Sequence, residues 1–194
     1  MKKLSSEFLE NHWQTENTPW DIGYLSPPLK AFIDDLTNKN LRILIPGAGS
    51  AYEAVYLFEN GFRNVYVCDW AESAFSNLRK KLPDFPNNQC LITDFFKLNL
   101  EVDLIIEQTF FCAIDPNLRT KYAEKTADIL SENGMLAGLL FAAEFPFEGP
   151  PFGGTKSEYV KIFEPYYKIT EMKIAKNSIG PRMNNELFVK FKKS

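Results

Sequence analysis

The chain has 194 residues, within the ~100–200 that usually make one domain, and we expect a single domain over residues 1–194. Its single histidine, His12, excludes a metal site built from several histidines, and its three cysteines form no C-x-x-C pair that would hold zinc. A formal net charge of −3 argues against a large nucleic-acid-binding surface, and no run of ~18 apolar residues could cross a membrane.

The predicted elements alternate, in chain order, between amphipathic helices and short apolar strands. Ser26-Pro27 is expected to cap a first helix whose apolar face is Leu29, Phe32, Ile33 and Leu36. Apolar runs predict strands at residues 41–45, 65–68, 89–93, 102–106, 135–141, 169–174 and 187–191. Helical spacing predicts helices at residues 51–58, 71–82 and 115–131, and one from a Thr155-x-x-Glu158 capping box to before Pro165.

This alternation is typical of βαβ units, so the fold class we expect is a doubly wound α/β domain. Its sheet would be mainly parallel, with helices on both faces in three αβα layers. In such a fold ligands bind beyond the carboxyl ends of the strands, so the loops that follow the strands are where chemistry is expected.

The first strand-to-helix turn reads Pro46-Gly47-Ala48-Gly49-Ser50, and Asp69 lies at the end of the next strand, 22 positions after Gly47. Two glycines allow a ligand to approach the backbone closely. A carboxylate about 20 residues after such a turn can accept hydrogen bonds from both hydroxyls of a ribose. The combination predicts a cofactor that contains adenosine; the alternative is a plain tight turn with a capping aspartate.

Tyr52 narrows the choice of cofactor, because a dinucleotide fingerprint needs a third glycine at that position. The chain also lacks the G-x-x-x-x-G-K-[ST] pattern of a phosphate-binding loop. A nucleoside without a pyrophosphate, bound to this kind of sheet, points to S-adenosylmethionine. Tyr52 in place of the third glycine also disfavours an NAD-dependent oxidoreductase.

The sequence resembles the class I methyltransferases, and within them the thiopurine, thiol and halide (or thiocyanate) methyltransferases. The segments that carry the resemblance are residues 18–23 (TPWDIG), 26–29 (SPPL), 45–50 (IPGAGS), 93–96 (TDFF), 103–116 (DLIIEQTFFCAIDP) and 148–152 (EGPPF). It spans nearly the whole chain, from about Trp13 to about Phe191. It implies a seven-stranded sheet whose last strand is antiparallel, with S-adenosylmethionine as cofactor and S-adenosylhomocysteine as product.

The resemblance also implies roles on the donor side. Trp13 and Trp20 would cover the cofactor, where an aromatic face attracts a desolvated cation by roughly 2 kcal/mol or more. The residues implied as cofactor-binding are Trp13, Trp20, Gly47, Ala48, Gly49, Asp69, Trp70, Asp94, Phe95 and Glu107. Ala48 departs from the cysteine that is common in this family. The alternative for both tryptophans is packing of the N-terminal segment.

On the acceptor side, Glu107 and Gln108 would lie at the rim where the methyl group faces the acceptor. The position of Gln108 is arginine in thiopurine enzymes and often tyrosine in halide and thiol enzymes, so the acceptor stays open. The expected pocket comprises Tyr24, Phe110, Phe111, Phe145 and Phe152. Of these, Phe111 is the residue for which a position in the core is the strongest alternative. Arg182 would either favour an anionic acceptor or be a solvated surface residue.

Two segments, residues 1–25 and 144–155, are expected to form an N-terminal lid and an acceptor-side loop that close over the site. His12 is interpreted as a surface residue of a helix beside Trp13. Cys68, Cys90 and Cys112 lie on or just after predicted strands, where buried, inert thiols are usual.

The resulting hypothesis is in-line methyl transfer to a small soft nucleophile, a reaction that needs no acid or base from the protein. A class I methyltransferase for an oxygen or nitrogen acceptor is an alternative, and it would need a base for which Glu107 is the evident candidate. A non-catalytic protein that binds the cofactor is a second alternative. The expected partner is a small-molecule acceptor, with no nucleic acid and no membrane. We expect a monomer in the cytoplasm, since the N-terminus lacks a signal peptide and the cysteines are scattered.

Overall fold

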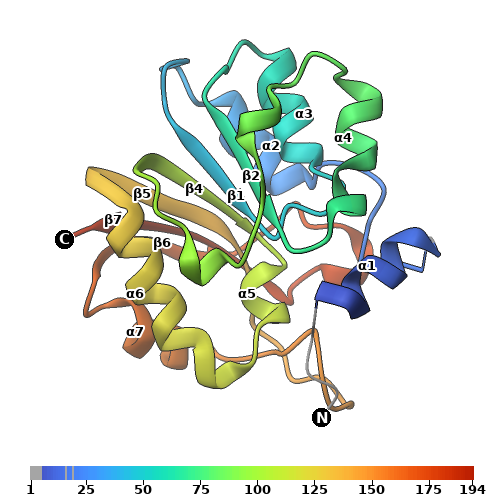
Figure 1. Cartoon of the computed structure of the whole chain (residues 1–194). Coiled ribbons are helices and arrows are strands. Elements are labelled where there is room, and N and C mark those ends of the chain that lie inside the picture. Colours follow the sequence, from blue (N-terminus) through green and yellow to red (C-terminus); the bar gives the residue numbers. More distant parts are fainter. Residues whose placement is uncertain (1–5, 16, 19) are drawn as a thin grey trace.

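The computed structural model describes residues 6–15, 17–18 and 20–194, and it is built around one seven-stranded sheet (Figure 1). The strands are β1 (Ile43–Pro46), β2 (Val65–Asp69), β3 (Cys90–Ile92), β4 (Val102–Gln108), β5 (Leu130–Phe141), β6 (Tyr167–Ile174) and β7 (Glu186–Lys193). They lie in the order β3-β2-β1-β4-β5-β7-β6. Strands β1 to β5 pair in parallel, whereas β7 runs antiparallel to both β5 and β6. The predicted mainly parallel sheet with an antiparallel last strand is confirmed.

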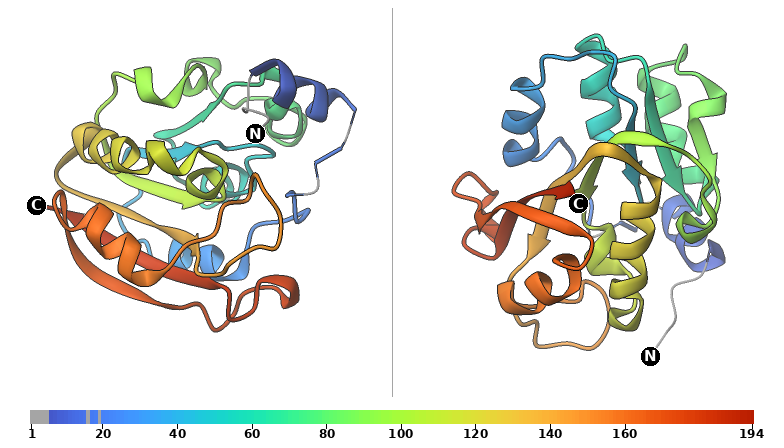
Figure 2. Two further views of the ribbon diagram at one scale, coloured as in Figure 1. Left: turned by 90° about the horizontal axis from the view of Figure 1, so that it is seen from below. Right: turned by 90° about the vertical axis from the view of Figure 1, so that its left-hand side faces the viewer.

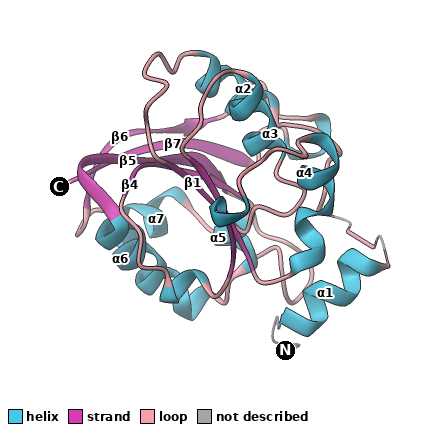
Figure 3. Cartoon of the chain, turned by 45° about the horizontal axis from the view of Figure 1, so that its top comes forward, coloured by secondary structure: helices cyan, strands magenta, loops and turns pink. Residues whose placement is uncertain are grey.

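Helices cover both faces of this sheet. They are α1 (Ser6–Gln14), α2 (Pro27–Asp34), α3 (Tyr52–Glu59), α4 (Ser76–Lys81), α5 (Phe110–Ala113), α6 (Arg119–Ile129) and α7 (Lys156–Phe163). Short 3₁₀ turns occupy Glu72–Phe75, Asn87–Gln89, Phe95–Lys97, Pro116–Leu118 and Gly180–Arg182. Helices α2, α3 and α4 lie on one face and α6 and α7 on the other, which gives the three predicted layers (Figure 3).

Each face of the sheet has its own hydrophobic core, because successive strand residues point to opposite sides. On β1, Ile43 and Ile45 face the core beneath α2, α3 and α4, and Leu44 faces the core beneath α6 and α7. All three are almost completely buried. Burial on both faces explains why β1 reads as a continuous apolar run.

Some boundaries differ from the prediction for local reasons. The helix expected over residues 115–131 divides into the 3₁₀ turn, capped by Asp115, and α6. Strand β5 then begins at Leu130, five residues before the predicted start. The register between β4 and β5 jumps from Val102↔Leu130 to Leu104↔Met135, so the intervening residues form a bulge.

The two predicted caps have different outcomes. The capping box of α7 is confirmed, since the Thr155 side chain accepts from the Glu158 amide and Glu158 accepts from the Thr155 amide. At α2, by contrast, the Ser26 hydroxyl makes no cap. It donates instead to Gln108 Oε1 at 2.7 Å, across 82 residues of sequence.

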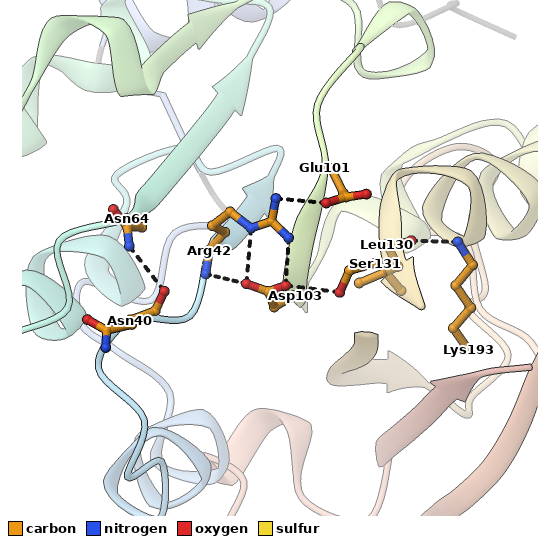
Figure 4. A network of polar contacts seen from close by, with 8 residues as sticks. All are labelled: Asn40, Arg42, Asn64, Glu101, Asp103, Leu130, Ser131 and Lys193. Carbon is orange, nitrogen blue, oxygen red and sulfur yellow. Dashed lines mark hydrogen bonds and ion pairs between the residues drawn. The ribbon is translucent and has the colours of Figure 1, made fainter. Parts of the chain in front are cut away.

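A polar cluster joins the strands at the amino end of the sheet (Figure 4). The Arg42 guanidinium donates to both carboxylate oxygens of Asp103, at 3.1 and 2.8 Å, and to Glu101 Oε1 at 2.9 Å. The Ser131 hydroxyl donates to Asp103 as well. These bonds, Arg42 foremost, lower the pKa of Asp103 to about 2. The cluster ties β1, β4 and β5 together at the end opposite the strand-to-helix loops.

At the carboxyl end of the sheet lie α1, α5 and the connection that follows β5 (Figures 1 and 2). The elements predicted to carry chemistry are therefore gathered at one end. None of the helices in the described part of the chain is long and apolar enough to cross a membrane.

Candidate functional site

The turn between β1 and α3 is shaped by three residues in the left-handed region: Gly47, Gly49 and Ala51, with φ of 57°, 51° and 53°. A Cβ on Gly47 would lie 2.5 Å from Cδ2 of Phe110, and one on Gly49 would lie 3.1 Å from Cζ2 of Trp13. Both positions thus favour glycine by conformation, and a Cβ on Gly47 would overlap the Phe110 ring whereas one on Gly49 would only press on Trp13. Ala51 has no such freedom, and an L-residue in this region costs about 1–2 kcal/mol. Such strain is typical of ligand-binding loops.

Asp69, at the end of β2, is bonded to this glycine loop. Its Oδ2 accepts from the Gly49 amide at 3.1 Å and its Oδ1 from the Ala71 amide at 3.0 Å. Burial raises the pKa of Asp69, and the amide bonds oppose that rise. An ionised carboxylate offers about four acceptor positions. The structure therefore brings the predicted ribose acid and the predicted loop into contact, with acceptor capacity left for a ligand. Trp70, the next residue, is exposed.

The two N-terminal tryptophans lie beside each other next to the loop. Their ring centroids are 6.2 Å apart with an interplanar angle of 76°, and Trp13 lies against Gly49. His12 is half-buried on α1 with its ring 5.7 Å from that of Trp20. The helical placement of His12 is confirmed, and its ring packs on the tryptophan pair.

Asp21 is a member of this site that the sequence did not single out. Its Oδ2 accepts from the Ser50 hydroxyl and, at 3.4 Å, from the Tyr52 hydroxyl. Its Oδ1 accepts from the Gly23 amide at 2.7 Å. The sequence signal for Asp21 was its place in the TPWDIG segment at residues 18–23. Its partners Ser50 and Tyr52 lie about 30 residues further along the chain, too far to be inferred from sequence.

The predicted adenine pair is only partly placed as expected. Asp94 is half-buried and accepts from the Phe96 amide at 3.0 Å, opening a 3₁₀ turn. Phe95 is only 2% exposed, and its ring packs against Phe110 and Tyr122, with centroids 5.2 and 5.4 Å away. The ring of Phe95 therefore packs mainly in the core, and its contact with adenine stays a prediction.

Glu107 is also placed differently from the prediction. Its side chain is completely buried. Its Oε1 accepts from the Phe111 amide at 2.9 Å and its Oε2 from the Tyr122 hydroxyl at 2.5 Å. Burial raises the pKa of Glu107 to about 7. The prediction of a rim position is wrong, because alternate residues of β4 point to opposite faces and Glu107 faces the α6 side.

Gln108 does reach the carboxyl edge of the sheet, where the Ser26 hydroxyl fixes its Oε1. The next residue, Thr109, has φ of 64° and is the N-cap residue directly before α5. A second non-glycine residue in the left-handed region therefore lies directly after the end of β4.

The aromatic residues predicted for an acceptor pocket separate into groups. Phe111 lies in the core, as expected, and Phe110 is half-buried between Gly47 and Phe95. Tyr24 is 53% exposed. Phe145 and Phe152 line an open hollow of about 440 Å³.

The hollow lies in the loop that follows β5. Its lining is Pro116, Ala143, Glu144, Phe145, Phe147, Gly149, Pro151, Phe152, Gly153, Gly154, Thr155 and Glu158. Its wall includes the stacked rings of Phe145 and Phe147, with centroids 5.4 Å apart. The glycine loop and Asp69 are not part of this lining, so the hollow is distinct from the expected donor site.

Arg182 is not a solvated surface residue, because its side chain is only 11% exposed. One guanidinium nitrogen donates to Glu186 at 3.3 Å and another donates to the Trp20 carbonyl at 3.1 Å. The Ser178 hydroxyl donates to the same Glu186. Arg182 therefore joins the connection between β6 and β7 to the N-terminal segment.

The cysteines are consistent with packing roles. Cys68 and Cys112 are buried and Cys90 is partly buried. Burial raises the pKa of the Cys68 thiol to about 12 and raises that of Cys112 further. Within the described residues, no group of three or more His, Cys, Asp or Glu side chains is placed to hold a metal ion.

Comparison with known proteins identifies relatives over almost the whole chain. The family model for thiopurine S-methyltransferase matches residues 4–190. A probable thiol methyltransferase 2 of Arabidopsis thaliana is 31% identical over 100% of this chain and 88% of the relative. Thiocyanate methyltransferase 1 of the same plant is 27% identical over 95% of this chain and 83% of the relative. A thiopurine S-methyltransferase of Vibrio cholerae is 24% identical, with coverage of 81% and 80%.

Solved structures share the fold at lower sequence identity. The 1,6-didemethyltoxoflavin-N1-methyltransferase of Burkholderia thailandensis, solved with S-adenosylhomocysteine, superposes with a TM-score of 0.78 at 14% identity, covering 97% of this chain and 87% of its own. Magnesium protoporphyrin IX methyltransferase of Synechocystis, solved with S-adenosylmethionine, gives 0.71 at 12% identity, with each chain covered completely.

Proposed function

The chain belongs to the thiopurine S-methyltransferase family and is an S-adenosylmethionine-dependent methyltransferase, and we propose that it methylates the sulfur of a small thiol. Thiopurines, thiocyanate and halides are the other soft nucleophiles that the same reaction would accept. The single observation that carries the proposal is the burial of Glu107. With this carboxylate enclosed in the core, the evident candidate for a general base is out of reach, which favours an acceptor that ionises in solution.

The donor site we propose consists of residues at the carboxyl ends of β1, β2 and β3, together with two tryptophans of the N-terminal segment. Gly47, Ala48 and Gly49 would hold the methionine part, because a loop without side chains at two of its three positions lets a ligand approach the backbone closely. Asp69 would accept the ribose hydroxyls. Trp70 and Asp94 would flank the adenine, and Trp13 and Trp20 would lie over the sulfonium. The contact between Asp69 and the Gly49 amide supports this arrangement, since it fixes the acid against the loop.

When bound, S-adenosylmethionine supplies a methyl group on a sulfonium, whose neutral thioether leaves without needing a proton. The protein's contribution is then orientation at ~3–3.5 Å and the exclusion of water. The two tryptophans and the Arg182 contact to Trp20 serve the exclusion of water. A thiol with an ordinary pKa of about 8.5 is a few per cent ionised near neutral pH, so a positive potential suffices to favour the thiolate. Arg182 is the residue that we propose for that potential.

The acceptor site we propose lies between the end of β4 and the loop after β5. Gln108, fixed by Ser26, would face the methyl group. Phe145 and Phe152 would contact the acceptor's apolar part from the hollow, with Phe110 and Tyr24 at its margins. A neutral amide with aromatic walls suits a small thiol better than a strongly hydrated oxygen acid. The 31% identical relative, named as a probable thiol methyltransferase, supports the same choice.

We further propose that residues 1–194 form a single methyltransferase domain that acts as a monomer in the cytoplasm. Residues 1–25 would be its lid and residues 144–155 its acceptor-side loop. The continuous sheet and the cores on both of its faces support one domain. A net charge of −3 supports a small-molecule partner over nucleic acid.

The test is a screen for transfer of a radiolabelled methyl group from S-adenosylmethionine. Small thiols, thiopurines, thiocyanate, iodide, carboxylic acids and amines are offered at equal concentration. The expected result is turnover of the thiols, which rises with pH as the thiolate fraction grows. Turnover confined to acids or amines would contradict the proposal. Calorimetry with S-adenosylhomocysteine is the control that the donor site is intact in the preparation.

A further inference from the structure

We propose that Asp21 is a positioning residue of the donor site. Its carboxylate joins the N-terminal segment to the glycine loop and holds both in the arrangement that receives the donor. This inference rests on the family's donor chemistry and is independent of which acceptor is used. It gives a role to Tyr52 as well, the residue that excluded a dinucleotide fingerprint.

Ser50 is the point at which the loop is held. It lies between Gly49 and Ala51, both of which have left-handed backbone conformations. Its carbonyl accepts from the Asn77 side chain at 2.7 Å, and its hydroxyl donates to Asp21 Oδ2. The strained stretch is thus fixed from one side by α4 and from the other by the N-terminal segment. Hydrogen bonds to an ionised carboxylate are about twice as strong as neutral ones, so the Asp21 side of this arrangement contributes substantially.

Tyr52 adds a second contact from the same direction. It is the first residue of α3, and its hydroxyl lies 3.4 Å from the same Oδ2 of Asp21. A third glycine at position 52 could make no such contact. One carboxylate oxygen thus receives a hydroxyl from the loop and another from the helix that follows it. The loop and α3 are therefore aligned with the N-terminal segment as one unit.

The other oxygen of Asp21 shapes the N-terminal segment itself. Oδ1 accepts from the Gly23 amide, and Gly23 has φ of +83°, so the carboxylate stabilises a tight turn directly after Trp20. The Trp20 carbonyl, in the peptide group that precedes Asp21, accepts from Arg182. The backbone that follows Trp20 is therefore held by two contacts, while the Trp20 ring packs on Trp13, which lies over Gly49. Removal of the Asp21 carboxylate would loosen the loop and its aromatic cover together.

The experiment measures the affinity for S-adenosylhomocysteine by calorimetry, together with the melting temperature. Asp21→Ala and Ser50→Ala are each expected to weaken binding about tenfold. The double variant is expected to bind no more than about twofold worse than Asp21→Ala, because that variant already lacks the bond to Ser50. Asp35→Ala is the matched control, since Asp35 is an exposed aspartate at the end of α2. It is expected to bind within twofold of wild type.

Two readouts separate positioning from a purely structural role. Binding of S-adenosylhomocysteine should change tryptophan fluorescence in wild type, and that change should be reduced in Asp21→Ala. Asp21→Asn serves if the alanine variant does not fold. It keeps the Gly23 bond but places an NH₂ group where two hydroxyls donate, so binding is expected to weaken at least threefold.

Affinity within twofold of wild type in the folded Asp21 variants would overturn the proposal. So would independent tenfold losses that multiply to about a hundredfold in the double variant. A wild-type chain that fails to bind S-adenosylhomocysteine would instead contradict the assigned cofactor. The two failures are therefore distinguishable.

Discussion

Replacement of Glu107 by glutamine tests where this carboxylate lies and what it does. In the folded protein burial raises the pKa of Glu107 from 4.5 to about 7. At ~1.4 kcal/mol for each pH unit, this rise corresponds to about 3 kcal/mol. A glutamine side chain can make the same contacts as the protonated acid. Its oxygen accepts from the Phe111 amide, and its NH₂ group donates to the Tyr122 hydroxyl oxygen.

The pH dependence has a definite sign. Below pH 4.5 the carboxyl is protonated in the folded and the unfolded chain, so its ionisation does not affect stability. Between pH 4.5 and 7 the unfolded chain releases the proton and the folded chain keeps it, so wild type loses stability as the pH rises. Above about pH 7 the loss is complete. Glu107→Gln escapes this loss, and its free energy of unfolding should gain about 3 kcal/mol relative to wild type between pH 4.5 and 8.

The assay is urea denaturation of both proteins, followed by circular dichroism at half-unit steps from pH 4.5 to 8. Burial also raises the pKa of Glu53 and Glu186, but both groups are present in either protein and cancel in the difference. A difference that does not change with pH would refute the argument. Glu107→Gln should also retain methyl transfer, and loss of turnover with intact donor binding would restore Glu107 as a base.

Three further substitutions test the site. Gly47→Ala should cost about 1–3 kcal/mol of stability and reduce donor binding, because residue 47 has a left-handed backbone conformation and its Cβ would lie 2.5 Å from Phe110. An unchanged melting temperature and an unchanged affinity in calorimetry would contradict this. Asp69→Ala should weaken donor binding by about 2–4 kcal/mol in calorimetry, and an unchanged affinity would mean that the ribose site is misplaced. Ser26→Ala releases Gln108 Oε1, so the acceptor KM should rise several-fold while affinity for S-adenosylhomocysteine stays constant. Equal effects on donor and acceptor would argue against an acceptor-side role.

The sheet and the glycine loop were predictable because their signals are local. A buried strand such as β1 is an uninterrupted apolar run, and the glycines directly follow it. Asp69 ends the next strand, and parallel neighbours bring their carboxyl ends to the same edge. Residues that share a βαβ unit can therefore be placed from sequence alone.

The rim position predicted for Glu107 failed because the sequence does not fix which way each side chain points along a strand. Glu107 and Gln108 are adjacent at the end of β4, and a shift of one residue exchanges the face beneath α6 for the face beneath α2. Nothing in the sequence indicates which of these two polar residues is enclosed. The packing of the Phe95 ring was not predictable from sequence either, because its direction depends on the Asp94-capped turn.

Asp21 escaped prediction for a different reason. Its partners Ser50 and Tyr52 are 29 and 31 residues away, and Asp21 itself lies in no helix or strand whose packing could predict them. The contact exists only because the N-terminal segment lies across the glycine loop. Sequence patterns report burial and local conformation, whereas such a contact depends on the path of an irregular segment.

The position of β7 between β5 and β6 has a consequence for how the protein is made. Synthesis runs from the N-terminus, so β6 emerges before β7, the strand to which it pairs. A nascent chain that ends after β6 exposes an unpaired strand edge, the kind of edge that aggregates or recruits chaperones. Arg182 lies in the connection between these two strands, so its bond to Trp20 forms only when this hairpin closes. The cover that we propose for the donor site is therefore completed late in biogenesis, although the glycine loop beneath it is synthesised much earlier.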